Sequence, residues 1–294
     1  MFGVAAAIRT LTEPGDSVLI CQPVYYPFAK IISDNRRKSA VSELVLKNGR
    51  YEIDFADFEN KIRHNNVKVF LMCSPHNPVG RVWTREELAE IAHICERNGV
   101  YIISDEIHSD FIYSGHRHIP IASLSPEIAE RTITCLSPTK TFNLAGLQAA
   151  NMIIADKTIR LRVGKECAAS GYSNLNIMAI AAAKASYKYG EEWLEALLQY
   201  LRQNISLLRS AFPDDAPIAA LDMEGTYLAW LDCRRLNLST LELDDLFLGK
   251  AGVWLHNGNT FGSGGQGFMR MNIACPRSVL EEALDRIKTA IYNI

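Results

Sequence analysis

The sequence predicts an α/β fold with three layers, in which helices cover both faces of a mainly parallel sheet. Short apolar runs alternate with helical patterns through the first two thirds of the chain, and polar clusters follow several of these runs. Such a strand–helix–strand order is typical of parallel sheets, whose chemistry gathers at the carboxyl ends of the strands. We therefore expect a candidate site along one edge of the sheet.

Five apolar runs have the length and composition of buried strands. They are SVLICQP, VKVFLMCSP, GVYIISDE, TITCLSP and NMIIA, which begin at residues 17, 67, 99, 132 and 151. A helix is predicted between the second and third runs, because Thr84 and Glu87 have capping-box spacing and Gly99 follows an apolar stripe. This arrangement supports a sheet with crossover helices.

The pattern changes after about residue 170. Residues 176–212 predict one or two long amphipathic helices. Strand-like segments follow at 226–233, 251–258 and 268–276, and a final helix is expected over 278–294. We predict a large domain over residues 1–194 and a smaller C-terminal α+β domain over residues 195–294.

Composition excludes several classes of protein. The 294 residues carry a net charge of only -2, so neither a basic surface for nucleic acid nor an acidic tail is expected. The apolar runs are too short to span a bilayer. The seven cysteines are odd in number and form no C-x-x-C pair, and the histidines share no metal-binding spacing. These features predict a cytoplasmic protein with reduced thiols and no metal site.

One lysine lies in an otherwise neutral segment, CLSPTKTFNLAGLQ, over residues 135–148. A lysine that acts as a nucleophile benefits from such a setting, because desolvation lowers the pKa of its amine. Lys140 alone is explained as well by an ordinary surface position. Asp105, His108 and Asn77, each after a predicted strand, are equally explained as loop or turn residues. The glycine-rich segment 261–268 leads into a strand rather than a helix, so it predicts a flexible loop.

The order of four motifs changes this interpretation. The chain contains N-P-x-G at Asn77, S-D-E-x-H from Ser104, S-x-x-K ending at Lys140, and R-x-N at Arg270. In this order it resembles the fold-type I pyridoxal-phosphate enzymes of the aminotransferase class I/II superfamily. SPHNPVGRVW, SDEIHSDFIY and SPTKTFNLAGLQ are most similar to the MalY/PatB-type branch, the carbon–sulfur β-lyases that act on cystathionine and related cysteine derivatives.

The resemblance implies pyridoxal 5'-phosphate as cofactor and a role for each of four residues. Lys140 would attach to the cofactor aldehyde and then remove the substrate Cα proton. Asp105 would pair with the pyridine nitrogen, because a carboxylate favours the protonated ring. Asn77 would donate to the phenolic oxygen. Arg270 would bind the substrate α-carboxylate through two parallel hydrogen bonds.

Five further residues are implied less directly. Ser137 would hold the phosphate, together with the backbone amides of Gly3 and Val4, which open a helical pattern. Tyr25 would stack on the ring, with Tyr26 as the weaker candidate. His108 stands where many aminotransferases have tyrosine, so it would share the role of Asn77 or simply lie nearby.

The sequence departs from the superfamily in two places. Gln148 occupies the position, eight residues after the lysine, where many aminotransferases carry an arginine that contacts phosphate. The β-lyase branch tolerates this change better. The chain also begins where relatives have completed roughly a quarter of their length. We therefore expect an N-terminally truncated chain that binds cofactor more weakly than a complete relative.

Three functions fit these residues. The first is β-elimination, which converts an S-substituted cysteine to thiol, pyruvate and ammonia. The second is transamination, which uses the same residues but needs a keto acid. The third is a non-catalytic remnant that keeps the fold. For the enzymes, the resemblance implies a homodimer acting on a small amino-acid substrate, with no nucleic acid or membrane partner.

Overall fold

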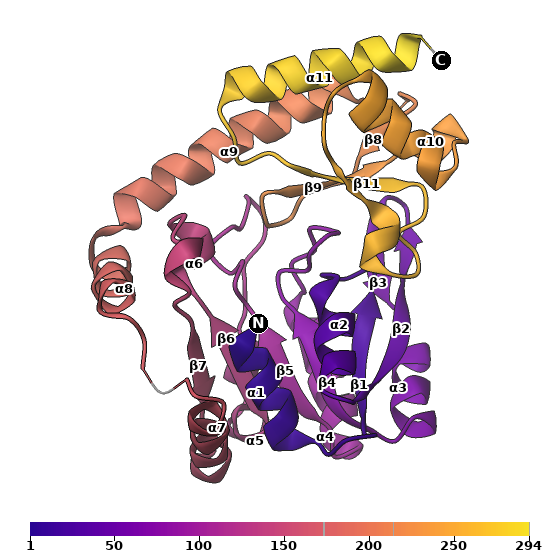
Figure 1. Cartoon of the computed structure of the whole chain (residues 1–294). Coiled ribbons are helices and arrows are strands. Elements are labelled where there is room, and N and C mark those ends of the chain that lie inside the picture. Colours follow the sequence, from indigo (N-terminus) through magenta and orange to yellow (C-terminus); the bar gives the residue numbers. More distant parts are fainter. Residues whose placement is uncertain (173, 214, 294) are drawn as a thin grey trace.

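A seven-stranded sheet is the centre of the larger part of this computed structural model, which describes residues 1–172, 174–213 and 215–293 (Figure 1). The strand order is β3-β2-β1-β4-β5-β6-β7. Neighbours among β1, β2, β4, β5 and β6 pair in parallel, whereas the edge strands β3 and β7 pair antiparallel. The strands are β1 Ser17–Gln22, β2 Lys38–Lys47, β3 Arg50–Ile53, β4 Val67–Cys73, β5 Tyr101–Asp105, β6 Thr132–Leu136 and β7 Asn151–Ile154.

All five predicted strands are confirmed as β1, β4, β5, β6 and β7. The sequence pattern missed β2 and β3. These two strands lie toward the edge of the sheet, and their exposed positions carry charged residues, so no continuous apolar run marks them. Burial therefore explains why β1, β4, β5 and β6 are visible in the sequence, whereas β7, which is partly exposed, is visible by its apolar composition alone.

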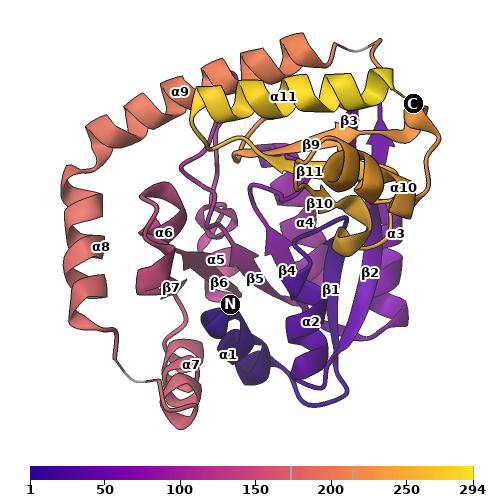
Figure 2. The same ribbon diagram turned by 45° about the horizontal axis from the view of Figure 1, so that its top comes forward.

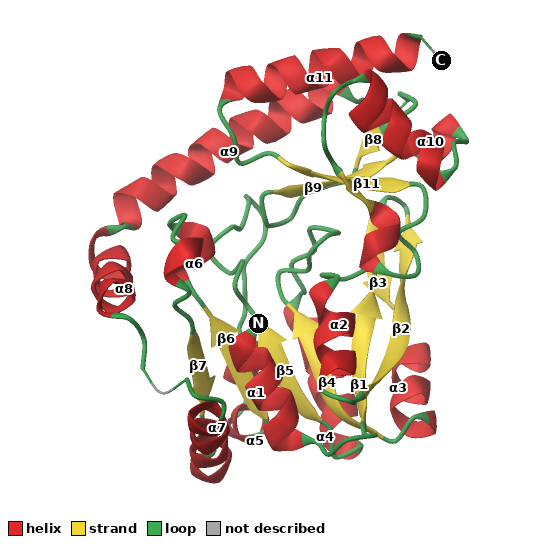
Figure 3. Cartoon of the chain, viewed as in Figure 1, coloured by secondary structure: helices red, strands yellow, loops and turns green. Residues whose placement is uncertain are grey.

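Helices cover both faces of the sheet, which confirms the three-layer prediction (Figure 3). One apolar core joins one face to α1 Phe2–Leu11, α2 Pro27–Asp34 and α7 Lys157–Ala169. The other core joins the opposite face to α3 Phe55–His64, α4 Arg85–Arg97 and α5 Pro126–Glu130. In α4 the predicted capping box is present: the Thr84 hydroxyl accepts from the Glu87 amide, and the Glu87 carboxylate accepts from the Thr84 amide.

A second, smaller sheet follows in the chain and is antiparallel, in the order β10-β11-β9-β8 (Figure 2). Its strands are β8 Ala219–Ala220, β9 Leu228–Asp232, β10 His256–Asn257 and β11 Phe268–Asn272. Beside it lie α9 Glu191–Ala211, α10 Thr240–Asp244, a π-helical segment Asp245–Lys250 and α11 Arg277–Tyr292. The predicted strand over 251–258 shrinks to two residues. The predicted domain boundary at residues 194 and 195 falls inside α9 and stays a prediction.

The remaining helices are α6 Pro138–Thr141, α8 Ile177–Tyr189 and 3₁₀ turns at Ile121–Ser123, Ala145–Leu147, Arg234–Leu236 and Gly258–Phe261. Gly190 separates α8 from α9, where the sequence left open one or two helices. A Cβ atom at Gly190 would lie 2.2 Å from the ring of Phe142, so only glycine permits this close approach. Helix α8 stands away from both sheets (Figures 1 and 2).

A buried ion-pair network joins the two sheets. The Glu224 carboxylate accepts from Arg81 Nε at 2.9 Å, from Arg50 Nε at 2.7 Å and from the Val82 amide at 2.8 Å. Arg81 is almost fully buried and also pairs with Glu87 at 2.7 Å. Glu224 precedes β9 of the small sheet, whereas Arg50 begins β3 of the large sheet and Arg81 lies in the segment between β4 and α4. The network therefore fixes how the two sheets meet.

Two features are absent from the described part of the chain. It contains no helix with the length and apolar character needed to cross a membrane. Nor does it bring three or more His, Cys, Asp or Glu side chains together as metal ligands. The seven cysteines are unpaired, and five of them are buried.

We predict that Glu224→Gln lowers the free energy of unfolding by about 3 kcal/mol, because it removes the charge that compensates buried Arg81. Urea denaturation would measure the change. The matched control is Asp222→Asn, which breaks an exposed pair with Arg209 and should cost less than about 1 kcal/mol. Equal losses for the two variants would contradict the role given to Glu224.

Candidate active site

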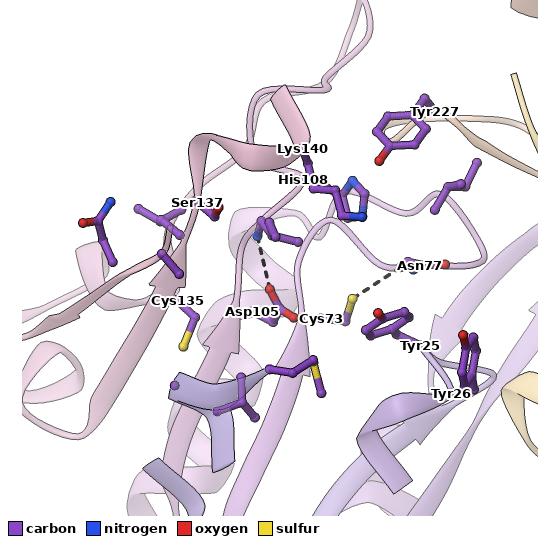
Figure 4. Close-up of a pocket in the computed structure, with 18 of the residues that line it drawn as sticks. Tyr25, Tyr26, Cys73, Asn77, Asp105, His108, Cys135, Ser137, Lys140 and Tyr227 are labelled. Atoms are coloured by element: carbon purple, nitrogen blue, oxygen red, sulfur yellow. Dashed lines mark hydrogen bonds between the residues drawn. The ribbon is translucent and has the colours of Figure 1, made fainter. Parts of the chain in front are cut away.

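The polar clusters predicted at strand ends come together in one cavity. Strands β4, β5 and β6 are parallel neighbours, so the segments after them reach the same edge of the sheet. These segments line a cavity of about 400 Å³ (Figure 4). All nine predicted site residues are among its lining residues: Gly3, Val4, Tyr25, Asn77, Asp105, His108, Ser137, Lys140 and Arg270.

Asp105 is the last residue of β5 and supplies the carboxylate of the cavity. Its Oδ1 accepts from the Ile107 amide at 3.3 Å. Burial raises the pKa of Asp105 to about 6, although this backbone hydrogen bond and the charge of Lys140 oppose the shift. The side chain is partly open to the cavity, while the protein beneath it excludes bulk water. Asp105 therefore carries its charge at neutral pH in a setting that favours a cationic partner.

Lys140 lies in the four-residue helix α6, directly after the end of β6. Helix α6 holds Lys140 where it is exposed, so the structure does not show the desolvated setting from which a nucleophilic lysine would benefit. Figure 4 shows Lys140 above Asp105 in the view, next to His108. No described residue forms an ion pair or hydrogen bond with its amine. The amine is therefore available to a ligand.

Asn77 and Arg270 meet across the two sheets. Asn77 lies in the turn after β4, and Arg270 lies in β11 of the small sheet. Arg270 Nη1 donates to Asn77 Oδ1 at 2.9 Å. Because the oxygen of Asn77 is engaged, its amide nitrogen is the atom left to donate to a ligand. The bond also holds the Arg270 guanidinium at the cavity.

The Arg270 guanidinium is buried without a carboxylate partner among the described residues. It lies 4.7 Å from the Phe261 ring centre, and its Nη2 approaches His256 Nδ1 at 3.4 Å. Its Nε has no hydrogen-bond partner. Burial lowers the pKa of Arg270 from its ordinary value, the sign expected of a cation removed from water. A buried, uncompensated guanidinium favours an incoming anion.

His108 is neutral in this structure across the physiological pH range. Burial lowers the pKa of its imidazole to about 3, and the charges of Lys140 and Arg270 add to the shift. The ring packs 5.4 Å from Tyr227 and 6.2 Å from Phe111, between ring centres. Its Nδ1 is buried without a hydrogen-bond partner among the described residues.

The Ser137 hydroxyl is already engaged. It bonds to the Ala149 carbonyl and to the Thr139 hydroxyl, each at 2.6 Å, and it accepts from the Thr139 amide to cap α6. A phosphate contact would therefore have to replace the bond to Ala149. This local role in capping is a second reason for serine at the position.

Helix α1 points its first turn at the cavity. Gly3 and Val4 lie in that turn, where backbone amides have no partner within the helix and the helix dipole favours an anion. Met152 fills the space beside Gly3, where a Cβ atom would lie 3.0 Å from its sulfur. Tyr25 is half-buried on another wall, and burial raises the pKa of its phenol.

Sequence reasoning missed Tyr227 and gave no role to Asn272, which also line the cavity. Burial raises the pKa of Tyr227 to about 12, so its hydroxyl stays protonated. Tyr227 lies at the start of a predicted strand with no polar motif around it, so no local signal marks it. Asn272 was visible as the last residue of R-x-N. Tyr26, the weaker candidate for ring stacking, lines the cavity as well.

Gln148 does not line this cavity. It is exposed beside an adjoining hollow of about 560 Å³, which Gly3 and Ser137 also line. Its backbone is left-handed, with φ 54° and ψ 33°. The residue at this position therefore borders a different hollow from the cavity that Asp105 and Lys140 line.

The donor and acceptor set of the cavity fits pyridoxal phosphate. An exposed amine suits the aldehyde, a carboxylate suits the ring nitrogen, and an amide nitrogen suits the phenolic oxygen. The first turn of α1 supplies N–H groups for a phosphate. In addition, Nδ1 of the buried His108 ring has no hydrogen-bond partner among the described residues, as expected of an atom beside a polar ligand.

The sequence model of the family "Aminotransferase class I and II" matches residues 3–287. The chain belongs to this family. Cystathionine β-lyase PatB of Bacillus subtilis strain 168 is 40% identical over 289 residues, which cover 98% of this chain and 75% of PatB. The match confirms the predicted superfamily and its branch.

Two solved structures of the family are closely similar. Cystalysin from Treponema denticola, which contains pyridoxal 5'-phosphate, has a TM-score of 0.96 and 38% identity, covering 99% of this chain and 74% of that one. A PLP-bound protein from Clostridium difficile 630, named provisionally as an aminotransferase, has a TM-score of 0.95 and 45% identity, covering 98% and 75%. This chain thus spans about three quarters of the length of these relatives.

We predict that Asp105→Asn raises the melting temperature of the cofactor-free protein more at pH 8 than at pH 4.5. A carboxyl whose pKa rises on folding, from 3.8 to about 6, costs stability as pH increases through that interval. Asparagine removes this cost and keeps the acceptor for Ile107. The gain at pH 8 should be about 3 kcal/mol, because each pKa unit is worth about 1.4 kcal/mol, and this corresponds to about 6–12 °C.

Thermal denaturation followed by circular dichroism would measure this difference. The control is Asp285→Asn, which changes an exposed carboxylate on α11 and should leave the pH dependence as in the wild type. A lower melting temperature for Asp105→Asn at pH 8 would show that burial does not disfavour the Asp105 charge.

Proposed function

We propose that this chain is a pyridoxal-phosphate-dependent carbon–sulfur β-lyase. It would convert cystathionine or a related S-substituted cysteine to a thiol, pyruvate and ammonia. The observation that carries the proposal is that Lys140, Asp105, Asn77 and Arg270 line one cavity. The relative named cystathionine β-lyase, at 40% identity, supports this reaction over others in the family.

Pyridoxal phosphate, when bound, supplies an electron-withdrawing ring that stabilises negative charge at the substrate Cα. Asp105 would hold the ring nitrogen in its protonated form through its carboxylate charge. Asn77 would donate its amide hydrogen to the phenolic oxygen, with His108 beside it. Tyr25 would lie against a face of the ring.

The phosphate would be held mainly by backbone groups. Gly3 and Val4 offer amides at the first turn of α1, where the helix dipole adds to the attraction. Ser137 would contribute its hydroxyl if that group left the Ala149 carbonyl. Gln148, at the position of the family's arginine, borders the adjoining hollow. In this proposal, backbone N–H groups therefore supply most of the hydrogen bonds to the phosphate.

Arg270 would orient the substrate. Its guanidinium is held at the cavity by Asn77 and has no competing carboxylate among the described residues. It would bind the α-carboxylate through two hydrogen bonds and so fix the direction of the Cα–H bond. The buried setting strengthens this pairing relative to one in water.

Lys140 would move the proton. In its neutral form, Nζ would take the proton from the substrate Cα. The electron pair left on Cα forms the Cα–Cβ double bond, and the Cβ–sulfur bond breaks with its electrons leaving on the thiolate. The thiolate gains a proton, and water converts the remaining fragment to pyruvate and ammonia. Exposure of Lys140 permits the movement that these steps require.

Transamination is the alternative reaction. The similar structure from Clostridium difficile 630, at 45% identity, is named as an aminotransferase, and this name favours the alternative. Both reactions would use the same four residues. They differ in whether the sulfur leaves and in whether a keto acid is needed.

We further propose that the chain acts as a homodimer. Helix α8 has one buried residue, Ala179, whereas Ile177 is 79% exposed and Met178 is 66% exposed. An apolar helix that stands outside both cores favours a partner that covers it. A second copy would bring the same apolar surface to this site. Because the seven cysteines are unpaired, we place the dimer in the cytoplasm.

We predict that the protein with added pyridoxal phosphate releases pyruvate from L-cystathionine without any keto acid. Lys140→Ala should lower this rate by a factor of about 10³ or more, because it removes the group that takes the proton. A coupled lactate dehydrogenase assay would measure pyruvate. A requirement for keto acid would point to transamination. No reaction with or without keto acid, and no cofactor absorbance that depends on Lys140, would point to a non-catalytic protein.

We predict that the protein sediments as a dimer of twice 32.8 kDa. The double variant Ile177→Glu with Met178→Glu should sediment as a monomer, because charge on the apolar face of α8 opposes its burial. The control is Val279→Glu, at an exposed position on α11, which should stay dimeric. A monomeric wild-type protein would refute the dimer.

A further inference from the structure

Three rings form a row at the edge of the cavity. The Tyr26 and His256 rings have centres 6.5 Å apart and planes 26° apart. The His256 and Trp254 rings have centres 6.3 Å apart and planes 20° apart. We call Tyr26, His256 and Trp254 the ring row. Tyr26 lines the cavity, so the row extends from the cavity toward solvent.

The ring row begins beside Arg270, the proposed anchor of the substrate. His256 of β10 is paired with Arg270 of β11, and Arg270 Nη2 approaches His256 Nδ1 at 3.4 Å. Phe261 packs against both Arg270 and Tyr26. A substrate held at Arg270 by its α-carboxylate would therefore have the first rings of the row as neighbours.

The rings at the two ends of the row are not part of the apolar cores. Trp254 is 82% exposed and Tyr26 is 45% exposed. Single exposed aromatics need no explanation, but near-parallel rings that continue a cavity wall offer flat apolar contact to a ligand. Such contact selects for planar apolar groups.

The charges of the residues that line the cavity also favour an uncharged S-substituent. Among the described lining residues, Lys140 and Arg270 are the cationic side chains. The proposed function uses Lys140 for the cofactor and Arg270 for the α-carboxylate. The lowered pKa values of His108 and His256, both caused by burial, keep these rings neutral. A second carboxylate on the substrate would find no further cationic side chain among the described lining residues.

We infer that the preferred substrates are cysteines whose S-substituent is uncharged and aromatic, bound along the ring row. This inference rests on the proposed β-lyase function and narrows its substrate class. Cystathionine carries an ammonium and a carboxylate at the far end of its S-substituent, so it would be a poorer substrate. The reaction itself is unchanged: the Cβ–sulfur bond breaks and the aromatic thiolate leaves with the electron pair.

The first test compares kcat/KM for S-benzyl-L-cysteine, S-methyl-L-cysteine and L-cystathionine in the holoenzyme, with pyruvate as the product measured. We expect S-benzyl-L-cysteine to exceed L-cystathionine at least tenfold. Trp254→Ala should lower the ratio of S-benzyl to S-methyl turnover about fivefold. The matched control is Tyr292→Ala, at an exposed aromatic on α11, which should leave the ratio as in the wild type. Equal or better turnover of L-cystathionine by the wild type would overturn the inference.

A second variant tests the charge argument by gain of function. Trp254→Arg adds a cation at an exposed position, where folding should tolerate it. The ratio of L-cystathionine to S-benzyl-L-cysteine turnover should rise about tenfold. An unchanged ratio would mean that the outer end of the row does not meet the substituent.

Binding separates failure of this inference from failure of the β-lyase proposal. Calorimetric titration of Lys140→Ala, which removes the proposed base, would compare the affinities for the same three amino acids. We expect tightest binding for S-benzyl-L-cysteine. If the wild type released no pyruvate, β-elimination would be wrong, and the titration would still decide specificity. If pyruvate formed but neither turnover nor binding favoured the benzyl compound, only the inference on specificity would fail.

Discussion

The buried carboxylate of Glu224 holds the two sheets in the relation on which the cavity depends. It compensates Arg81, which lies in the segment that follows Asn77, and it stands three residues before Tyr227. The wall from the large sheet and the wall from the small sheet therefore share one electrostatic contact. The hydrogen bond from Arg270 to Asn77 repeats this connection at the cavity itself. An anchor for substrate on one sheet can then face cofactor groups on the other.

The parallel sheet supplies the second constraint. Because β4, β5 and β6 run in the same direction, residues that are far apart in the chain reach one edge. Helix α1 brings its first turn to the same edge, and its unpaired amides add partial positive charge there. The site thus consists of strand ends and one helix end, which are the positions where a packed α/β core leaves polar groups unsatisfied.

Charges in the cavity are separated rather than paired. Asp105, Lys140 and Arg270 are all without an ion-pair partner among the described residues. Burial shifts the pKa values of Asp105 and Arg270 toward their neutral forms, so each gains from a ligand of opposite charge. This cost to the folded protein is the physical basis of its affinity for a charged cofactor and an amino-acid substrate. The neutral rings of the ring row would then select substrates by the substituent on their sulfur atom.

The sequence by itself determined the fold class, five strands of the large sheet and the family. Burial produces continuous apolar runs, and the chemistry of the motifs requires residue types such as Lys140 and Asp105 at fixed places in the chain order. The sequence could not show β2 and β3, in which charged residues interrupt the apolar positions. It also could not show that Lys140 is exposed.

Tertiary structure decided the contacts between segments distant in the chain. No local pattern pairs Glu224 with Arg81, places Tyr227 in the cavity or aligns the ring row beside Arg270. These contacts form where loops of one sheet meet strands of the other, and only the packing of the two sheets fixes their geometry. Strand ends are predictable because direction in a parallel sheet is fixed. Contacts across the cavity are not predictable from the sequence, because they depend on how two separately packed cores are joined.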